Sequence, residues 1–254
     1  MNPPGTKIVS LRNVGKTFES GTVALDGLSL DVHAGEFVSL LGPSGCGKAT
    51  ALRIIAGLSV PAAGAVEWPF GDSKIGFVFQ EPTLMPWADV AANVRLPLKL
   101  AHGDEAQAQI AVRQVIARVG LAEFAQSYPR ELSGGMKMRT SIARALVTEP
   151  QLLLMDEPFA ALDEITRFKL NNDLLRLWQD LRRTVIFVTH SVFESVYLSQ
   201  RIVVMTPRPG RVFAEIAIPA PCPRDERFRT SAEYAGYCRQ VAEALSKAMA
   251  GGGT

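Results

Sequence analysis

The chain has 254 residues, of which 47% are hydrophobic and 20% are charged, and its formal net charge at pH 7 is +2. This length suits one large α/β domain or two small ones, and the apolar fraction supplies a sizeable core and argues against disorder. A charge so close to neutral gives no reason to expect nucleic acid as a partner. The amino terminus lacks a signal-peptide pattern, and no apolar run approaches the ~20 residues of a membrane span. The three cysteines (Cys46, Cys222 and Cys238) form no metal-like or disulfide-like cluster, so we expect a cytoplasmic protein.

Three short β-like runs precede residue 36, at 8–11, 22–25 and 28–32. Their composition predicts antiparallel strands beside a main sheet. Phe18 lies between the first two runs. It has two open interpretations, a ring that stacks on a nucleotide base or an ordinary core aromatic.

A glycine-rich stretch lies between an apolar run at 36–41, a predicted strand, and a predicted helix at 51–56. It reads Gly42-Pro43-Ser44-Gly45-Cys46-Gly47-Lys48-Ala49-Thr50. Strand, glycine-rich turn and helix together are typical of a phosphate-binding loop, because bare N–H groups and the helix N-terminus attract anions. Lys48 is expected to reach the β- and γ-phosphates.

Ala49 departs from this motif. The motif places a hydroxyl directly after the lysine, where its oxygen coordinates Mg²⁺. A methyl group cannot coordinate a metal, and Thr50, one residue later, points elsewhere around a helix.

The middle of the chain predicts strands at 65–68 and 75–79, the second followed by Gln80. An irregular segment at 81–87 carries three large apolar side chains, and helices are predicted at 89–101 and 104–119. We interpret the strand-poor block 86–148 as a helical insertion in an α/β domain. Near its end, Ser133 is a plausible N-cap, and Gly134 and Gly135 permit close approach of a ligand to the N–H groups of the next helix.

The remaining sequence predicts two buried strands with polar residues at their ends. The run 151–155 ends in Asp156 and Glu157, and the run 184–189 ends in His190. Ligands of open α/β sheets bind at such carboxyl ends, where Asp156 could hold Mg²⁺ and Glu157 could activate water. Further elements are expected as helices at 164–182, 191–199 and 226–248, and as strands at 202–205 and 211–218.

Six elements now stand in order along the chain: Phe18, the loop 42–50, Gln80, the stretch 132–136, the strand 152–157 and His190. Together they resemble the nucleotide-binding subunit of an ABC transporter, over residues 7–218. The residues at 79–87, 132–136 and 155–159 are similar to those of the bacterial nitrate/sulfonate/taurine/bicarbonate importer ATPases.

The resemblance implies an α/β fold, a P-loop NTPase cassette. Such a cassette has a mostly parallel sheet core, an N-terminal antiparallel β subdomain and an inserted α-helical subdomain. We expect one ABC ATPase domain over 1–254. Its core would span about 1–85 and 149–224, its helical subdomain about 86–148, and its C-terminal helical extension about 225–254.

The resemblance also implies an ATP site that uses Mg²⁺. The loop 42–50 would cradle the phosphates, Phe18 would stack on adenine, and Thr50 would support the α-phosphate side. Asp156 would hold Mg²⁺, and Gln80 would contact Mg²⁺ or the attacking water. The remaining implied roles are the base for Glu157, a γ-phosphate contact for His190, and a place at the subunit junction for Asp163.

The implied partners are a second copy, a permease and, indirectly, a periplasmic or extracellular solute-binding protein. Ser133, Gly134 and Gly135 would close over the ATP of the second copy in a head-to-tail dimer. The ATPase would then lie in the cytoplasm, on the inner face of the cell membrane, attached through the integral membrane permease.

Two alternatives remain open. One is a non-transport ABC ATPase, although the tandem cassettes, zinc modules and basic tails of such proteins are not visible here. The other is a nucleotide-binding subunit whose hydrolysis is impaired by Ala49, because a missing metal ligand lowers Mg²⁺ affinity or activity.

Overall fold

A computed structural model describes residues 5–71, 74–102, 104–220 and 224–251. The chain divides into two compact units, the first formed by residues 1–73 and 182–254 and the second by residues 74–181. Cys222 lies outside the described residues. Of the described helices, none is both long and apolar enough to cross a membrane.

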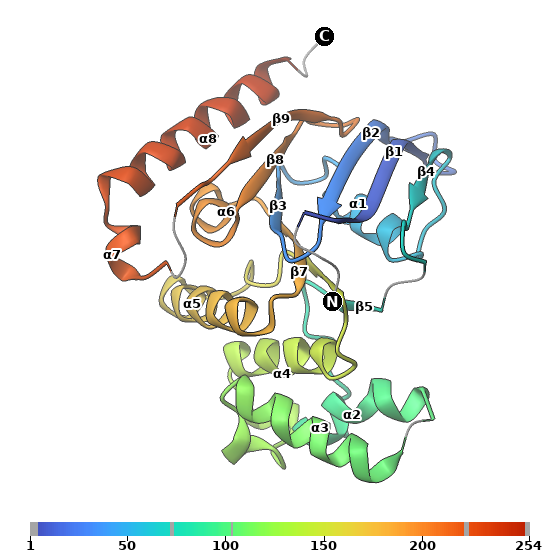
Figure 1. Ribbon diagram of the computed structural model, residues 1–254, viewed down its shortest axis with the longest axis vertical. Helices are drawn as coiled ribbons and strands as arrows, with labels where there is room; N and C mark the ends of the chain where they lie inside the picture. Colours follow the sequence, from blue (N-terminus) through green and yellow to red (C-terminus); the bar gives the residue numbers. More distant parts are fainter. Residues whose placement is uncertain (1–4, 72–73, 103, 221–223, 252–254) are drawn as a thin grey trace. The chain divides into compact units, whose positions relative to one another are not determined.

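The first unit contains a three-stranded antiparallel sheet in the order β2-β1-β4 (Figure 1). Its strands are β1 (Lys7–Thr17), β2 (Val23–His33) and β4 (Ala63–Glu67). The runs at 22–25 and 28–32 were predicted as separate strands, and the structure corrects this, because both belong to β2. Gly27 has a φ of 65°, and the pairing of β2 with β1 is irregular near this residue, so β2 continues through it as one strand.

The same unit holds four neighbouring strands in the order β7-β3-β8-β9. They are β3 (Phe37–Leu41), β7 (Thr184–Thr189), β8 (Arg201–Met205) and β9 (Val212–Ala217). The first three run parallel, and β9 is antiparallel to β8. All residues of β3 and β7 are buried, as expected for parallel strands covered on both faces.

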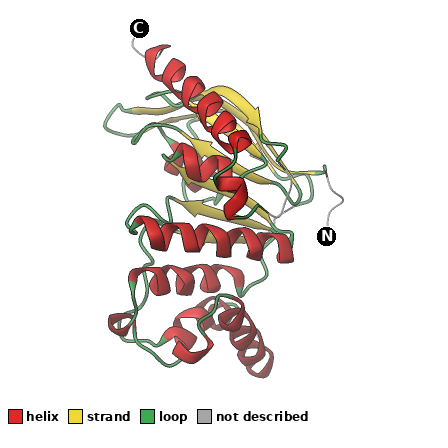
Figure 2. Cartoon of the chain, turned by 90° about the vertical axis from the view of Figure 1, so that its left-hand side faces the viewer, coloured by secondary structure: helices red, strands yellow, loops and turns green. Residues whose placement is uncertain are grey.

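The helices of this unit are α1 (Lys48–Ile55), α6 (Val192–Leu198), α7 (Glu226–Arg229) and α8 (Ala232–Gly251). Helix α8 contacts α6 and β8 and crosses in front of the strands in Figure 2. The prediction of a single helix at 226–248 is wrong, because residues 230 and 231 are not helical and separate α7 from α8. The Ser231 hydroxyl accepts the N–H of Tyr234 at 3.1 Å and so starts a new helix.

Arg224 connects the C-terminal helices to α6. Its side chain is buried, and one guanidinium nitrogen donates to the carbonyls of Val196, Tyr197 and Ser199 at 2.8, 3.0 and 2.8 Å. These carbonyls lie at the end of α6, where helical partners run out. The Tyr197 hydroxyl in turn donates to the Arg224 carbonyl at 3.1 Å.

The second unit contains the parallel strands β5 (Ile75–Val78) and β6 (Leu152–Asp156). Its helices are α2 (Val90–Leu100), α3 (Glu105–Arg118), α4 (Gly134–Leu146) and α5 (Glu164–Leu181). Short 3₁₀ helices lie at η1 (Ala122–Phe124) and η2 (Pro129–Glu131). Gly76 permits α4 to approach β5, since a Cβ there would lie 2.6 Å from the Ala145 carbonyl.

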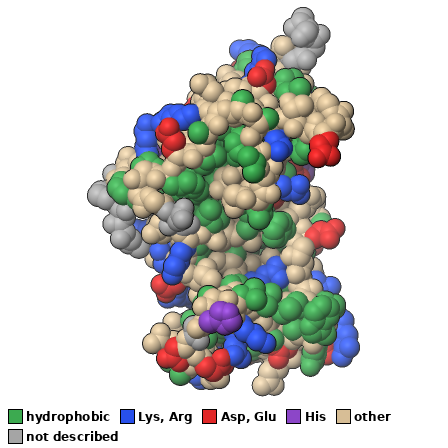
Figure 3. Space-filling view, turned by 90° about the vertical axis from the view of Figure 1, so that its right-hand side faces the viewer, with side chains coloured by type: hydrophobic (Ala, Val, Ile, Leu, Met, Phe, Trp, Pro, Cys, Tyr) green, Lys and Arg blue, Asp and Glu red, His purple; other side chains and the backbone are tan. Residues whose placement is uncertain are grey.

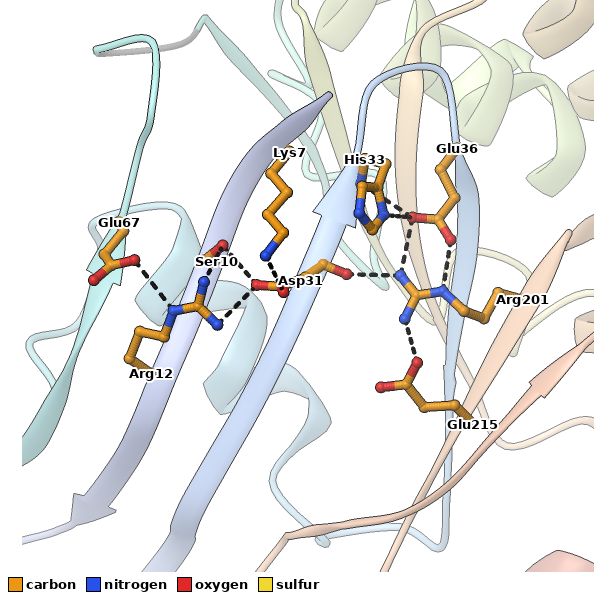
Figure 4. Close-up of polar contacts among 9 residues, drawn as sticks. All are labelled: Lys7, Ser10, Arg12, Asp31, His33, Glu36, Glu67, Arg201 and Glu215. Atoms are coloured by element: carbon orange, nitrogen blue, oxygen red, sulfur yellow. Dashed lines mark hydrogen bonds and ion pairs between the residues drawn. The ribbon is translucent and has the colours of Figure 1, made fainter. Parts of the chain in front are cut away.

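An ion-pair network holds the turn that leads into β3 (Figure 4). Arg201 donates to both carboxylate oxygens of Glu36, at 2.6 and 2.9 Å, and also reaches Glu215. Burial is the largest single influence and raises the pKa of Glu36, but the hydrogen bonds from Arg201 and from the His33 N–H, together with the nearby positive charge, hold this pKa below its ordinary value of 4.5. The pair thus stabilises the strand that carries the glycine-rich loop.

We expect Arg201→Met to lower the free energy of unfolding by about 2–3 kcal/mol, because it leaves a mostly buried carboxylate without its cation. Lys7→Met, which breaks a more exposed pair with Asp31, is the control and should cost less than about 1 kcal/mol. Urea unfolding measures both. Because the pKa of Glu36 is depressed in the folded state, the contribution of its ion pair to the free energy of unfolding is present above pH 4.5. It is lost as the pH falls through the folded-state pKa. Equal losses in the two variants would contradict this assignment.

Candidate functional site

The glycine-rich loop joins the buried strand β3 to helix α1. Gly45 and Gly47 adopt φ angles of 74° and 105°, a region that favours glycine. The sequence predicted a helix that begins at residue 51, but α1 begins at Lys48. The reason is that Gly47 takes the N-cap position and its carbonyl accepts the N–H of Ala51 at 2.9 Å. Residues 48–50 therefore form the first helical turn.

Two glycines of this loop have no room for a side chain. A Cβ on Gly42 would lie 2.9 Å from the sulfur of Cys46, and one on Gly47 would lie 2.6 Å from the Ala24 carbonyl. Cys46 is itself only 1% exposed. The loop therefore presents bare backbone next to a helix N-terminus, which fits a phosphate group.

Lys48 is folded back into this loop. It is 3% exposed, and its Nζ donates to the carbonyls of Gly42 at 2.7 Å and Pro43 at 2.9 Å. A phosphate oxygen could replace these neutral acceptors with a stronger, charge-assisted bond. The Lys48 ammonium therefore lies inside the loop, and its contact with the β- and γ-phosphates stays a prediction.

Ala49 and Thr50 are the second and third residues of α1, and both are partly exposed. Successive side chains of a helix are rotated by about 100°. Thr50 therefore does not direct its hydroxyl along the Ala49 Cβ, in agreement with the sequence analysis.

His190 follows β7 on the same edge of the sheet as the loop. Strands β3 and β7 are parallel, and Leu41 pairs with Thr189, so Gly42 and His190 each follow matching strand ends. His190 is exposed. Just before it, the Thr189 hydroxyl donates to Glu194 at 2.6 Å and accepts the N–H of Ser191 at 3.0 Å, which fixes the start of α6.

Phe18 lies just after β1 and is 43% exposed, with the Lys16 ammonium 5.7 Å from the centre of its ring. This exposure excludes the interpretation as an ordinary core aromatic. It leaves stacking on a base as a prediction.

The second unit places its candidate residues at the ends of β5 and β6. Val78 pairs with Met155, so Gln80, two residues beyond, lies at the same edge as Asp156 and Glu157. Gln80 is exposed and the two carboxylates are partly exposed. Glu157 has a φ of 45°, an uncommon conformation for this residue type that often occurs at functional sites.

The segment 133–135 forms the start of α4. The Ser133 hydroxyl accepts the N–H of Met136 at 3.3 Å and caps the helix. Cβ atoms on Gly134 and Gly135 would lie 3.2 Å from Leu162 and 2.9 Å from Thr166, respectively. The glycines therefore also permit tight packing against the start of α5, a role that the sequence did not indicate.

Asp163 is exposed and caps α5, since its carboxylate accepts the N–H of Thr166 at 2.9 Å. Hydrogen bonds from Thr166, above all, hold the pKa of Asp163 below its ordinary value. The capping role is thus structural, and the place at a subunit junction stays a prediction.

Sequence reasoning missed Arg144 of α4. Its guanidinium donates to the carbonyls of Thr83 at 2.8 Å and Pro82 at 2.7 Å, and to the Thr83 hydroxyl at 2.9 Å. It therefore fixes the segment that follows Gln80. No local pattern indicates this contact, because more than sixty residues separate the partners.

We expect Arg144→Met to lower the free energy of unfolding by about 1.5–3 kcal/mol, because three acceptors lose a charged donor. Backbone amides at 80–85 should exchange their hydrogens faster. Arg139→Met, on the same helix, removes an ion pair with the partly exposed Asp173 and should cost less than about 1 kcal/mol. Unchanged exchange at 80–85 in Arg144→Met would contradict the anchoring role.

The candidate residues of the first unit and those of the second unit supply different chemical groups. The first unit supplies bare N–H groups, an ammonium, an aromatic ring and an imidazole, while the second supplies two carboxylates and an amide. In the described chain, no three His, Cys, Asp or Glu side chains gather as a metal site. Mg²⁺ commonly binds through one or two carboxylates, waters and substrate phosphates, so Asp156 fits this ion and the methyl group of Ala49 does not.

The comparisons with known proteins agree with this geometry. A family model described as ABC transporter matches residues 25–160. An uncharacterized ABC transporter ATP-binding protein of Methanocaldococcus jannaschii is 45% identical over 247 residues, which cover 93% of this chain and 91% of that protein. An aliphatic sulfonates import ATP-binding protein of Pseudomonas syringae pv. syringae is 45% identical over 220 residues, which cover 87% and 90%.

Solved structures are similar over most of the chain. One is described as the dimeric, post-hydrolysis state of an ATP-binding cassette bound to ADP and Pi. It is 34% identical, with a TM-score of 0.73 over 84% of this chain and 100% of that chain. Another is cbiO1 from Clostridium perfringens, part of the ABC transporter complex cbiONQ, at 25% identity and a TM-score of 0.77 over 95% and 97%. The fold class expected from the sequence is confirmed.

Proposed function

The chain belongs to the ABC transporter family of ATP-binding proteins, and we propose that it drives solute import through a membrane permease by binding and hydrolysing ATP. The observation that carries the proposal is the bare phosphate loop with the buried Lys48 ammonium inside it. Relatives from Pseudomonas syringae are named as aliphatic sulfonates import ATP-binding proteins. They support organic sulfonates, within the nitrate/sulfonate/taurine group, as the transported class.

In this proposal the first unit binds the nucleotide. The N–H groups of 42–50 surround the phosphates, and Lys48 exchanges its loop carbonyls for phosphate oxygens. Phe18 stacks on adenine with its exposed face. His190, at the matching strand end, contacts the γ-phosphate.

The second unit supplies the groups for hydrolysis. Glu157 accepts the proton of the attacking water, and its left-handed backbone holds the carboxylate at the tip of β6. Gln80 orients that water, and Asp156 provides the oxygen ligand for Mg²⁺. When bound, Mg²⁺ neutralises charge on the phosphates.

We further propose a head-to-tail dimer that closes on ATP. Ser133, Gly134 and Gly135 face the γ-phosphate held by the second copy, and Asp163 lies at the junction. Ser133, Gly134 and Asp163 are exposed in this chain. The dimeric cassette structure with ADP and Pi supports such an arrangement. ATP then favours the closed dimer and hydrolysis releases it.

The permease would bind to the second unit near 81–94. Trp87 is 76% exposed there, and large exposed apolar side chains are typical of interaction surfaces. Figure 3 shows one face of the molecule, on which hydrophobic patches are bordered by charged side chains. This contact would hold the chain at the cytoplasmic face of the membrane, where a solute-binding protein delivers substrate to the permease from the other side.

Ala49 favours a second candidate function, a subunit that binds ATP and hydrolyses it slowly. Its methyl group occupies the position from which a hydroxyl would coordinate Mg²⁺. The intact carboxylates at the end of β6 favour the active enzyme.

We expect Ala49→Ser to raise Mg²⁺-dependent hydrolysis by about 10–100-fold, because it restores an oxygen ligand. ATP binding without Mg²⁺ should change less than about twofold, since the loop and Lys48 are untouched. Ala56→Ser, the same substitution at the C-cap of α1, is the control. Rates are measured across a Mg²⁺ titration, and equal rates for Ala49→Ser and the unmodified chain would show that this position does not limit turnover.

Growth tests the proposed function directly. In cells that lack this chain, the intact gene should restore growth on an aliphatic sulfonate as the only sulfur source. Glu157→Gln should fail to do so, because loss of a general base lowers turnover by about 10²–10⁴-fold while ATP binding is retained. Sulfate as the sulfur source serves as the control. Growth on the sulfonate without the gene would refute the substrate class, and full activity of Glu157→Gln would refute the assigned base.

A further inference from the structure

The turn between β8 and β9, residues 206–211, contacts the phosphate loop. The Nε and Nη2 atoms of Arg208 donate to the Gly45 carbonyl at 3.2 and 3.0 Å. Arg208 belongs to none of the motifs described above. Both residues lie in the first unit.

This turn has a defined internal structure. The Thr206 hydroxyl donates to the Pro209 carbonyl at 2.9 Å and accepts the N–H of Arg211 at 3.0 Å. The Thr206 N–H also donates to the Arg211 carbonyl at 3.0 Å. Arg208 therefore extends from an ordered turn, although its side chain is exposed.

The turn is also docked on the first sheet and on the loop. The Gly210 N–H donates to the Ala24 carbonyl at 2.9 Å, and its carbonyl accepts the N–H of Asp26 at 3.2 Å. A Cβ on Gly210 would collide with the Cys46 carbonyl. Arg211 forms an ion pair with Asp26.

The Arg208 contact selects one orientation of a peptide group. In a planar trans peptide, the carbonyl of Gly45 and the N–H of Cys46 point in opposite directions. With the carbonyl held by Arg208, the Cys46 N–H turns toward the Pro43 carbonyl, 3.4 Å away across the loop. Gly45 has φ of 74° and no side chain, so this residue itself restricts the orientation of the peptide only weakly.

We infer that Arg208 is a positioning residue for nucleotide binding, which keeps the Gly45–Cys46 peptide in the orientation that turns the Cys46 N–H into the loop, where a phosphate oxygen could replace the Pro43 carbonyl as its acceptor. Its guanidinium also adds positive charge beside the loop. This inference rests on the proposed ATP-binding function. It predicts an effect on nucleotide affinity and a smaller one on the chemical step, because Arg208 acts through the loop and not on the reacting atoms.

The test compares Arg208→Met, Arg208→Lys and Arg211→Met in the full chain. Arg211→Met is the matched control, because it removes the same charge from the same turn without altering the Gly45 contact. Equilibrium binding of a fluorescent ATP analogue gives Kd, steady-state hydrolysis gives kcat, and hydrogen exchange of the nucleotide-free protein reports on amides 44–48.

Arg208→Met should raise Kd about five- to tenfold, leave kcat within about twofold, and speed exchange at 44–48. Arg208→Lys should recover part of the affinity, since an ammonium can donate one of the two hydrogen bonds. Arg211→Met should bind like the unmodified chain.

Equal Kd values for Arg208→Met and the unmodified chain would overturn this inference and leave the proposed function intact. An equal rise in Arg211→Met would assign the effect to charge or turn stability and would also overturn it. If the unmodified chain binds no ATP analogue, the proposed function fails, and this inference fails with it.

Discussion

The structure depends on the absence of a side chain at two positions between β3 and α1, Gly42 and Gly47, and at Gly210, which packs against the same loop. Three separate crowded contacts enforce this, at Gly42 against Cys46, at Gly47 against Ala24, and at Gly210 against Cys46. Steric exclusion of this kind is insensitive to salt and pH, unlike a charged contact. The backbone at Gly42 and Gly47 therefore holds its shape before any anion arrives, and the Lys48 ammonium lies inside the loop.

Strand pairing provides the second level of organisation. The paired ends of β3 and β7 place Gly42 and His190 together, and the paired ends of β5 and β6 place Gln80 beside Asp156 and Glu157. Each unit thus brings its own candidate site residues to one edge of its strands, because the carboxyl ends of parallel strands in matching register lie at the same edge. Helix caps then set the residue at which the next helix begins, as with Ser191 before α6 and Asp163 before α5.

Sequence reasoning succeeded where the information is local. The apolar runs that end in Asp156 and His190 and the glycines of the loop identify their strands and ends, because periodicity and residue type act over a few positions. It failed at element boundaries, since the left-handed geometry of Gly47 and the irregular pairing at Gly27 depend on neighbours in space. It could not find Arg144 or Arg208, whose acceptors are backbone carbonyls far away in the chain. A carbonyl acceptor has no residue-type signature, so no motif can record such a contact.

The Arg224 contact limits how much of the C-terminal segment can be removed without disturbing α6. The guanidinium satisfies three carbonyls at the end of α6, the helix that begins just after His190. Shortening the chain to remove this arginine would leave these buried acceptors without a donor, at the helix that follows a candidate catalytic side chain. The segment that can be shortened or replaced during evolution without loss of these hydrogen bonds therefore begins only after residue 224.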